Sequence, residues 1–390
     1  MTALESSSAH YCEGRARLSL GDGFFRAQSR PARDISVLLA RSLARRPRGE
    51  GGQRWLDLMA GCGIRALRWG LEALPEVGSG VELWVNDADP DRLPLLKTNL
   101  APLASRVQVL KLSAMPAEVL LARAFAEKRF FDLIDLDAFG SPSALIQPVL
   151  QVLAFDGVLL LASTDGRSPT GHDRPGAIRS FGAAARAHPA SWELALRLQL
   201  GLLARQAWML GRGVQPLLAF SEGRTFRLAV RLARRPTAAE EEHLGLVARC
   251  ERCGDQQLQP LLRLQGWPRC HCPDGAGRWA ISGPLWLGAL QDPSALQALM
   301  DPREDLETRT QRLIQRLQAD PGVPARVWPT DELSRRLGMD GPPGVADLVE
   351  TLRRAGHQAW PSAVMAGQVR TDADLPELLQ LCAGLRSEGP

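Results

Sequence analysis

Short apolar runs alternate with helical segments between about residues 54 and 163. Each run is short enough for a buried strand, and helices of ordinary length fit between the runs. Strands that alternate with helices form a parallel sheet, because a helix makes each return crossover. We therefore expect a doubly wound α/β fold. The runs are WLDLM (55–59), VELWVND (81–87), VQVLKL (107–112), FFDLIDL (130–136) and GVLLLAS (157–163).

A hairpin marks the end of this pattern. A long helical stretch, about 192–210, precedes two apolar runs, 215–221 and 225–232, which a Glu222–Gly223–Arg224 turn separates. With these runs we predict a mostly parallel, seven-stranded sheet of the Rossmann-like kind. An amphipathic helix at about 34–46 precedes the first strand.

The composition and the hydrophobic pattern of the chain change after Leu232. Arg234, Arg235 and Pro236 form a polar break, and the remaining sequence is rich in proline, glycine and short helical patterns. We predict two domains, residues 1–235 and a smaller α+β domain of residues 236–390.

The composition fits two domains. Of 390 residues, 45% are hydrophobic, which is enough for a full α/β core and more. Residues 1–20 lack the apolar stretch of a signal peptide, and no later segment runs long enough without charges to span a bilayer, so we predict a cytoplasmic location. The net charge is +4, and arginine carries almost all the positive charge. Arginine suits phosphate recognition, but the arginine content alone is only weak support for a nucleic-acid substrate.

The first strand ends in a glycine-containing loop, Asp57-Leu58-Met59-Ala60-Gly61-Cys62-Gly63, that leads into a helix. Its glycines let a ligand approach the backbone, and Asp87 at the end of the second strand is placed to accept hydrogen bonds from ribose hydroxyls. Because Gly61 to Ala66 matches the dinucleotide fingerprint G-x-G-x-x-A, a nicotinamide cofactor and S-adenosylmethionine both fit the pattern. Asp57 favours S-adenosylmethionine, since a carboxylate beside the loop repels a pyrophosphate and attracts an ammonium or sulfonium group.

A second loop follows the fourth strand and reads Asp135-Leu136-Asp137-Ala138-Phe139-Gly140-Ser141. Doubly wound folds bind ligands beyond the carboxyl ends of their strands, so we expect this loop to face the cofactor loop. Asp137 is the predicted acceptor that directs an aromatic amine toward a methyl carbon, and Phe139 the predicted stacking partner of its base. Asp135 is predicted to be buried. A turn carboxylate and a core aromatic are the plain alternatives for Asp137 and Phe139.

Four of the seven cysteines cluster after the domain break. Cys250-x-x-Cys253 and Cys270-His271-Cys272 offer four thiolates for a tetrahedral zinc site that staples a small subdomain. His271 is an alternative ligand, because the second pair is tighter than C-x-x-C. A group of reduced thiols without metal is the other interpretation.

With these features, the chain resembles the tRNA guanine-26 N2-dimethyltransferase family over most of its length. The first and last matching segments are the most specific, because a generic methyltransferase has no reason to carry them. The resemblance implies a class I methyltransferase core and a C-terminal domain that helps to hold tRNA. The segments are FFRAQSRPARDIS (24–36), LDLMAGCGIRALRWGLE (56–72), NDADP (86–90), DLDAFGSP (135–142), ASTD (162–165) and GPLWLG (283–288).

The resemblance also implies roles for single residues. Phe24 and Phe139 would sandwich a guanine flipped out of its helix, with Asp137 at the point of methyl transfer. Arg33 would contact the methyl donor. The full predicted cofactor-binding set is Arg33, Asp57, Gly61, Gly63, Arg65, Asp87, Ser113 and Ala114.

Three family motifs are altered in this chain. FYNP reads Phe24-Phe25-Arg26-Ala27, NRD reads Ala32-Arg33-Asp34, and DPFG reads Asp137-Ala138-Phe139-Gly140. Ser113 stands where the family carries an acid for the adenine amine.

We predict transfer of one or two methyl groups from S-adenosylmethionine to the N2 amine of a guanine, at position 26 of tRNA. A nucleotide-dependent oxidoreductase with a structural zinc and a non-catalytic RNA-binding protein on a methyltransferase fold stay open as alternatives. A methyltransferase of DNA amines is a third, against which the GPLWLG segment argues.

Overall fold

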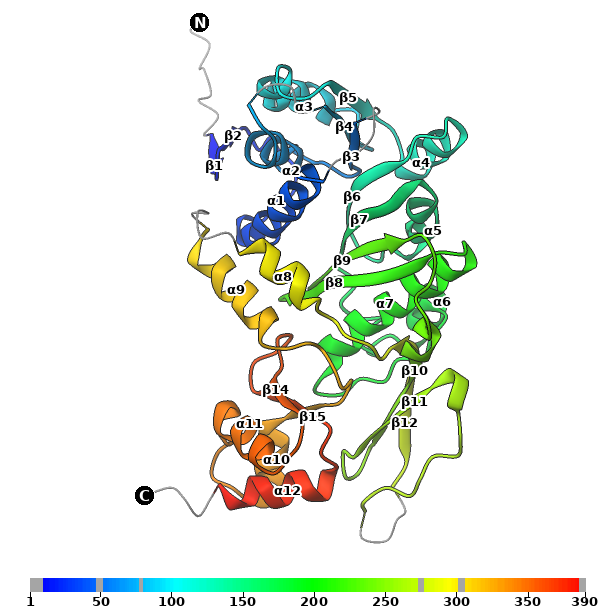
Figure 1. Cartoon of the computed structure of the whole chain (residues 1–390), viewed down its shortest axis with the longest axis vertical. Coiled ribbons are helices and arrows are strands. Elements are labelled where there is room, and N and C mark those ends of the chain that lie inside the picture. The colour runs from blue at the N-terminus through cyan, green and yellow to red at the C-terminus, as the bar shows by residue number, and fades with distance from the viewer. Residues whose placement is uncertain (1–9, 47–51, 77–79, 273–276, 301–305, 386–390) are drawn as a thin grey trace, which may run out of the picture. The chain divides into compact units, whose positions relative to one another are not determined.

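The computed structural model describes residues 10–46, 52–76, 80–272, 277–300 and 306–385 (Figure 1). The chain divides into two compact units, each built from several segments. Unit 1 is Met1–Ala138, Leu145–Ala162 and Ala298–Leu313. Unit 2 is Phe139–Ala144, Ser163–Gln297 and Ile314–Pro390.

The largest sheet has seven strands in the order β5-β4-β3-β6-β7-β9-β8 (Figure 1). The pairs β5–β4, β4–β3 and β3–β6 are parallel, whereas β8 and β9 pair antiparallel from Gly213↔Ala233 to Glu222↔Thr225. The sheet is therefore mixed, and our prediction of a mostly parallel sheet was wrong. The reason is the short turn after β8, because a tight hairpin joins only antiparallel strands. The strands are β3 (Gln53–Asp57), β4 (Val81–Asp87), β5 (Val109–Ala114), β6 (Phe131–Ala138), β7 (Leu153–Ser163), β8 (Gly213–Glu222) and β9 (Thr225–Ala233).

Helices connect these strands as the alternating pattern predicts. The predicted helix at 34–46 is α1, which begins earlier, at Arg30, because Pro31 favours the first turn of a helix. Its apolar face, with Ile35, Leu38 and Leu39, is buried. None of the helices within the described residues is both long and apolar enough for a membrane crossing. The helices are α1 (Arg30–Ala44), α2 (Ile64–Arg68), α3 (Arg92–Leu100), α4 (Ala117–Ala126), α5 (Ser143–Val152), α6 (Arg174–Phe181), α7 (Ser191–Met209), α8 (Pro293–Leu299), α9 (Thr308–Gln318), α10 (Thr330–Leu337), α11 (Val345–Arg354) and α12 (Leu375–Gly384).

Three smaller sheets complete the architecture. Unit 1 holds the hairpin of β1 (Tyr11–Glu13) and β2 (Ala16–Leu18). Unit 2 holds a sheet in the order β11-β10-β12 and another in the order β13-β15-β14. Their strands are β10 (Leu244–Cys250), β11 (Gln256–Pro260), β12 (Trp279–Trp286), β13 (Val327–Pro329), β14 (Ala359–Pro361) and β15 (Gln368–Thr371).

The GPLWLG segment has a structural role inside unit 2, where it docks α7. Arg197 in α7 donates hydrogen bonds to the carbonyl oxygens of Trp286 (3.0 Å) and Gly288 (3.1 Å). Gly201 faces the same strand, and a Cβ there would lie 2.9 Å from Leu285 Cα. The GPLWLG segment thus joins a helix to a strand.

A buried ion cluster fixes the same face of α7, because Glu193 lies one turn before Arg197 and pairs with it at 2.8 Å. Arg370 donates to both carboxylate oxygens of Glu193, at 2.7 Å each, and to Asp320 at 2.7 Å. Burial alone raises the pKa of Glu193, but the guanidinium groups of Arg370 and Arg197 lower it to about 2. These buried charges are paired, as a low-dielectric interior requires.

Candidate active site

The glycine loop after β3 borders open space. Gly61 and Gly63 both have left-handed φ angles, +57° and +79°, which favour glycine. A Cβ at Gly63 would lie 2.9 Å from Leu96, whereas a Cβ at Gly61 would meet no atom within 4 Å. The backbone N–H of Gly61 donates to Asp87 Oδ2 at 2.8 Å, so this loop and the end of β4 are held together. Gly61 and Asp87 are thus in direct contact, and the cofactor-binding roles of Gly61, Gly63 and Asp87 stay predictions.

Asn86 ties three strand ends together, and the sequence analysis missed it. Its buried amide donates to the carbonyl oxygens of Leu58 (3.1 Å) and Met115 (2.9 Å). Its Oδ1 accepts from Ser113 Oγ at 2.7 Å. Ser113 and Ala114 end β5 beside Asn86 and Asp87, so the two predicted adenine-side residues lie next to the ribose-side acid. The available signal was a polar amide inside an apolar strand, one residue before its end.

A cluster of three acids surrounds Arg65 in unit 1. The guanidinium of Arg65 contacts Asp137 at 2.6 Å and Asp135 at 3.2 Å, and its side chain is only 9% exposed. Asp57 accepts a hydrogen bond from the backbone of Ala66 at 3.2 Å. Burial, and then the charge of Asp135, raise the pKa of Asp57 to about 8, against the opposing effect of Arg65. Arg65 therefore holds the predicted catalytic acid, Asp137, in one geometry.

The loop after β6 is held by the ASTD segment. The N–H of Gly140 donates to Thr164 Oγ1 at 2.7 Å, and its carbonyl accepts from the N–H groups of Thr164 (3.0 Å) and Asp165 (3.1 Å). Ser163 Oγ donates to the same carbonyl at 3.1 Å. Phe139, one residue before this anchor, is 74% exposed. The plain alternative of a core aromatic is therefore wrong for Phe139.

The second predicted stacking residue, Phe24, is also exposed, at 68%. The guanidinium of Arg26 lies 5.6 Å from the centre of its ring. Single exposed apolar side chains are common on protein surfaces, so the exposure shows only that both rings are accessible. Phe24 and Phe139 are thus suited to stack on a base.

Arg33 is buried and already bound to protein groups. It donates to both carboxylate oxygens of Glu13, at 2.7 and 2.5 Å, and to the carbonyl of Arg26 at 3.1 Å. Its guanidinium also lies 4.9 Å from the centre of the Phe25 ring. Its visible role is to fix the segment that carries Phe24. Its predicted contact with the methyl donor stays a prediction.

Glu13 is the centre of this buried network, and no sequence pattern pointed to it. Besides Arg33, it accepts from Arg68 at 2.7 Å, and Arg68 also contacts Asp34 at 2.7 Å. Burial alone raises the pKa of Glu13, but the hydrogen bond and charge of Arg33 lower it below its usual range. The N-terminal segment is thereby joined to α1 and α2.

The four cysteines form one buried cluster in unit 2. Their sulfur atoms all lie within 4.8 Å of one another, and Cys250 and Cys272 are 3.8 Å apart. A Cβ at Gly277 would lie 2.3 Å from Cys270 Sγ, so the chain closes tightly over the sulfur atoms. His271 points elsewhere, because its Nδ1 bonds the buried carboxylate of Asp255 at 2.8 Å. The spacing thus identified the cluster correctly, and the cysteines rather than His271 compose it.

Comparison with known proteins gives one consistent result. The family of N2,N2-dimethylguanosine tRNA methyltransferases matches residues 18–383. The tRNA (guanine(26)-N(2))-dimethyltransferase of Thermococcus kodakarensis is 29% identical over 359 residues, which cover 87% of this chain and 88% of that protein. The protein of the same name from Methanoregula boonei is 28% identical over 366 residues, 93% of this chain and 91% of its own.

A solved structure has the same fold. The complex of Trm1 from Pyrococcus horikoshii with S-adenosyl-L-methionine matches with a TM-score of 0.80 at 23% identity, covering 96% of this chain and 99% of that chain. The likeness confirms the Rossmann-like class of the fold.

Proposed function

Because the chain belongs to the family of N2,N2-dimethylguanosine tRNA methyltransferases, we propose that it transfers methyl groups from S-adenosylmethionine to the N2 amine of a guanine in tRNA. The names of its relatives support position 26 as the target and dimethylguanosine as the product. The observation that carries the proposal in this chain is Asp137, a carboxylate fixed at 2.6 Å by Arg65 at the carboxyl end of β6. Ligands of such folds bind at this edge of the sheet.

The residues of the glycine loop fit the methyl donor. S-adenosylmethionine supplies a methyl group activated by its sulfonium charge. The open backbone at Gly61 gives it room, and Asp87 is placed to accept from its ribose hydroxyls. Asp57 would attract its ammonium group, and a nearby cation favours the ionised form of a carboxylate whose pKa burial has raised. Gly63 and Arg65 shape the loop, and Ser113 and Ala114 border the adenine side.

Asp137 orients the amine of the target guanine. The lone pair of this amine is delocalised into the base, and an acceptor that grips the amine hydrogens directs the nitrogen toward the methyl carbon. As the N–C bond forms and the C–S bond breaks, the nitrogen loses a proton, which the Asp137 carboxylate receives directly. Arg65 keeps the Asp137 side chain aligned before transfer.

Phe24 and Phe139 supply stacking surfaces for the flipped guanine. Each ring is more than half exposed, and each is anchored through its own segment, by the Glu13–Arg33 pair and by the Gly140–Thr164 contacts respectively. Stacking on an aromatic face offsets part of the cost of removing a base from its helix.

The cysteine cluster fits a structural zinc ion. A zinc–sulfur distance of about 2.3 Å gives a tetrahedron whose sulfur atoms lie about 3.8 Å apart, and the Cys250–Cys272 distance is 3.8 Å. Cys250, Cys253, Cys270 and Cys272 would fill all four positions, so the ion would have no open position for chemistry. The division into domains at 235/236, the role of residues 236–390 in holding tRNA, and a cytoplasmic location stay predictions.

Removal of the Asp137 carboxylate tests the proposal. Asp137→Asn is nearly isosteric, and we expect it to lower methyl transfer to unmodified tRNA by at least about a hundredfold. Binding of S-adenosylhomocysteine, measured by calorimetry, should stay near the wild-type value. An Asp137→Asn protein that methylates tRNA at the wild-type rate would refute the assigned mechanism. Asp22→Asn, at an exposed aspartate, is the matched control.

A further inference from the structure

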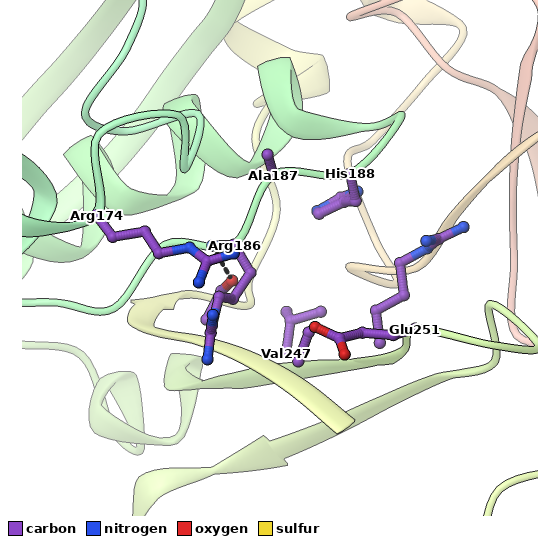
Figure 2. Close-up of a pocket in the computed structure, with 9 residues that line it drawn as sticks. Arg174, Arg186, Ala187, His188, Val247 and Glu251 are labelled. Carbon is purple, nitrogen blue, oxygen red and sulfur yellow. Dashed lines mark hydrogen bonds between the residues drawn. The ribbon is translucent and has the colours of Figure 1, made fainter. Parts of the chain in front are cut away.

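A cleft of about 410 Å³ lies within unit 2 and contains none of the predicted site residues (Figure 2). One wall is the start of α6 and the connection from α6 to α7. The floor is formed by β10 and β12. Its lining residues are Arg174, Arg186, Ala187, His188, Val247, Arg249, Glu251, Ala280 and Ser282.

Positive charge dominates this cleft. Arg174 and Arg186 lie on the same side in Figure 2, and no carboxylate among the described residues is paired with either side chain. Arg249 forms an ion pair with Glu332. Glu251 is the one acidic residue among those that line the cleft. An anion would therefore meet more cations than acids, and two of the guanidinium groups are uncommitted.

Hydrogen bonds fix the wall before any ligand arrives. Ala184 and Gly283 exchange two backbone hydrogen bonds of 2.8 Å, which attach the connection to β12. The backbone N–H of Arg186 donates to Ser282 Oγ at 3.0 Å, the contact drawn in Figure 2. A preformed wall lowers the entropic cost of binding.

His188 adds a neutral donor. Its Nδ1 accepts from the N–H of Ala190 at 3.1 Å, so the proton of the neutral ring lies on Nε2. Burial, and then the charge of Arg249, lower the pKa of His188 to about 4, which keeps the ring neutral near pH 7.

We propose that this cleft binds a backbone phosphate of the tRNA substrate, with Arg174 and Arg186 as its principal ligands. Arginine forks match phosphate oxygens, and such contacts hold a nucleic acid in register without reading its sequence. The inference rests on the proposed function, because it identifies the phosphate as part of the methyl acceptor.

Two opposite variants test the cleft. Arg174→Gln/Arg186→Gln removes both uncommitted cations, and we expect it to weaken binding of an unmodified tRNA transcript about tenfold and to lower the slope of log Kd against log salt by about one. Glu251→Gln removes the opposing charge and should tighten binding about twofold to threefold. Misfolding of Glu251→Gln cannot explain a gain of affinity for tRNA. Arg335→Gln, at an exposed arginine of α10, controls for the loss of an arginine outside the cleft and should bind like the wild type.

The readouts separate this inference from the proposed function. The affinity for tRNA tests the proposed phosphate site, and methyl transfer by the wild type tests the proposed function. A double arginine variant that binds like Arg335→Gln, or a Glu251→Gln protein that binds more weakly than the wild type, overturns the cleft while transfer by the wild type upholds the function. A wild-type protein that binds tRNA through the cleft and transfers no methyl group overturns the function alone. A wild type that does not bind tRNA overturns the cleft.

Discussion

Asp57 illustrates a conflict between stability and ligand binding at a single residue. It lies 2% exposed at the end of β3, near Asp135 and Arg65. A protein without a ligand to bind gains little from two buried acids at one strand edge, since burial and like charge both penalise ionisation. Sequence reasoning found Asp57 from its position before the glycines, but its raised pKa depends on Asp135 and on burial, which only the fold reveals.

Asp57→Asn should stabilise the free protein and weaken donor binding. The pKa of Asp57 is about 8 in the folded protein, against an ordinary value of 3.8 in the unfolded chain. Between these values the folded state retains a proton that the unfolded chain has lost, so stability falls as pH rises. The asparagine of the variant does not titrate. Its free energy of unfolding should therefore equal that of the wild type at about pH 4 and exceed it by more than about 1 kcal/mol at pH 8.

Denaturant unfolding at several pH values measures this difference, with Asp22→Asn as the control. Calorimetry should show at least about tenfold weaker binding of S-adenosylhomocysteine by Asp57→Asn. An equal loss of stability at every pH would contradict the account of Asp57.

Local sequence signals predict the elements well where a period or a turn residue dominates. The apolar face of α1, the hairpin β8–β9 and the glycine turn at Gly61 all follow from such signals. The network around Glu13 does not, because its charges come from β1, α1 and α2 and have no shared spacing. The hairpin was predicted, but its antiparallel strands were counted in a sheet described as mostly parallel, and the sheet is mixed.

The proposed zinc ion would act at the scale of elements, because its cysteine ligands would join β10 to the segment before β12. Cys250 ends β10, and the Cys270–Cys272 pair precedes β12. Purified protein should contain about one zinc ion per chain, measured by mass spectrometry. Cys272→Ser should lose the ion and lower the free energy of unfolding by several kcal/mol, because metal affinity contributes directly to folding.

Cys12→Ser is the control, because that thiol is exposed and lies outside the cluster. Protein without zinc whose Cys272→Ser variant is as stable as Cys12→Ser would show that the cysteines are only packed thiols.

The chain does not divide simply at the scale of the whole molecule. Residues 298–313 belong to unit 1, and Thr310 Oγ1 donates to Asp34 Oδ2 at 2.6 Å across a very long sequence separation. A composition change such as the one at Pro236 cannot reveal a contact of this kind, since it carries no information on which distant segments meet. The family resemblance, by contrast, was predictable from short motifs, because the glycine loop, the Asp137 loop and GPLWLG each meet a local physical need.

At the scale of the whole molecule, the proposed activity is methylation of a guanine in tRNA. The most direct measurement is to incubate the protein with labelled S-adenosylmethionine and an unmodified tRNA transcript, and then to identify the modified nucleosides. We predict N2-methylguanosine and N2,N2-dimethylguanosine, both lost when guanine 26 of the transcript is replaced by adenine. Methyl transfer to a different base or to a different atom of guanine, or no transfer by protein that binds S-adenosylmethionine and tRNA, would contradict the account.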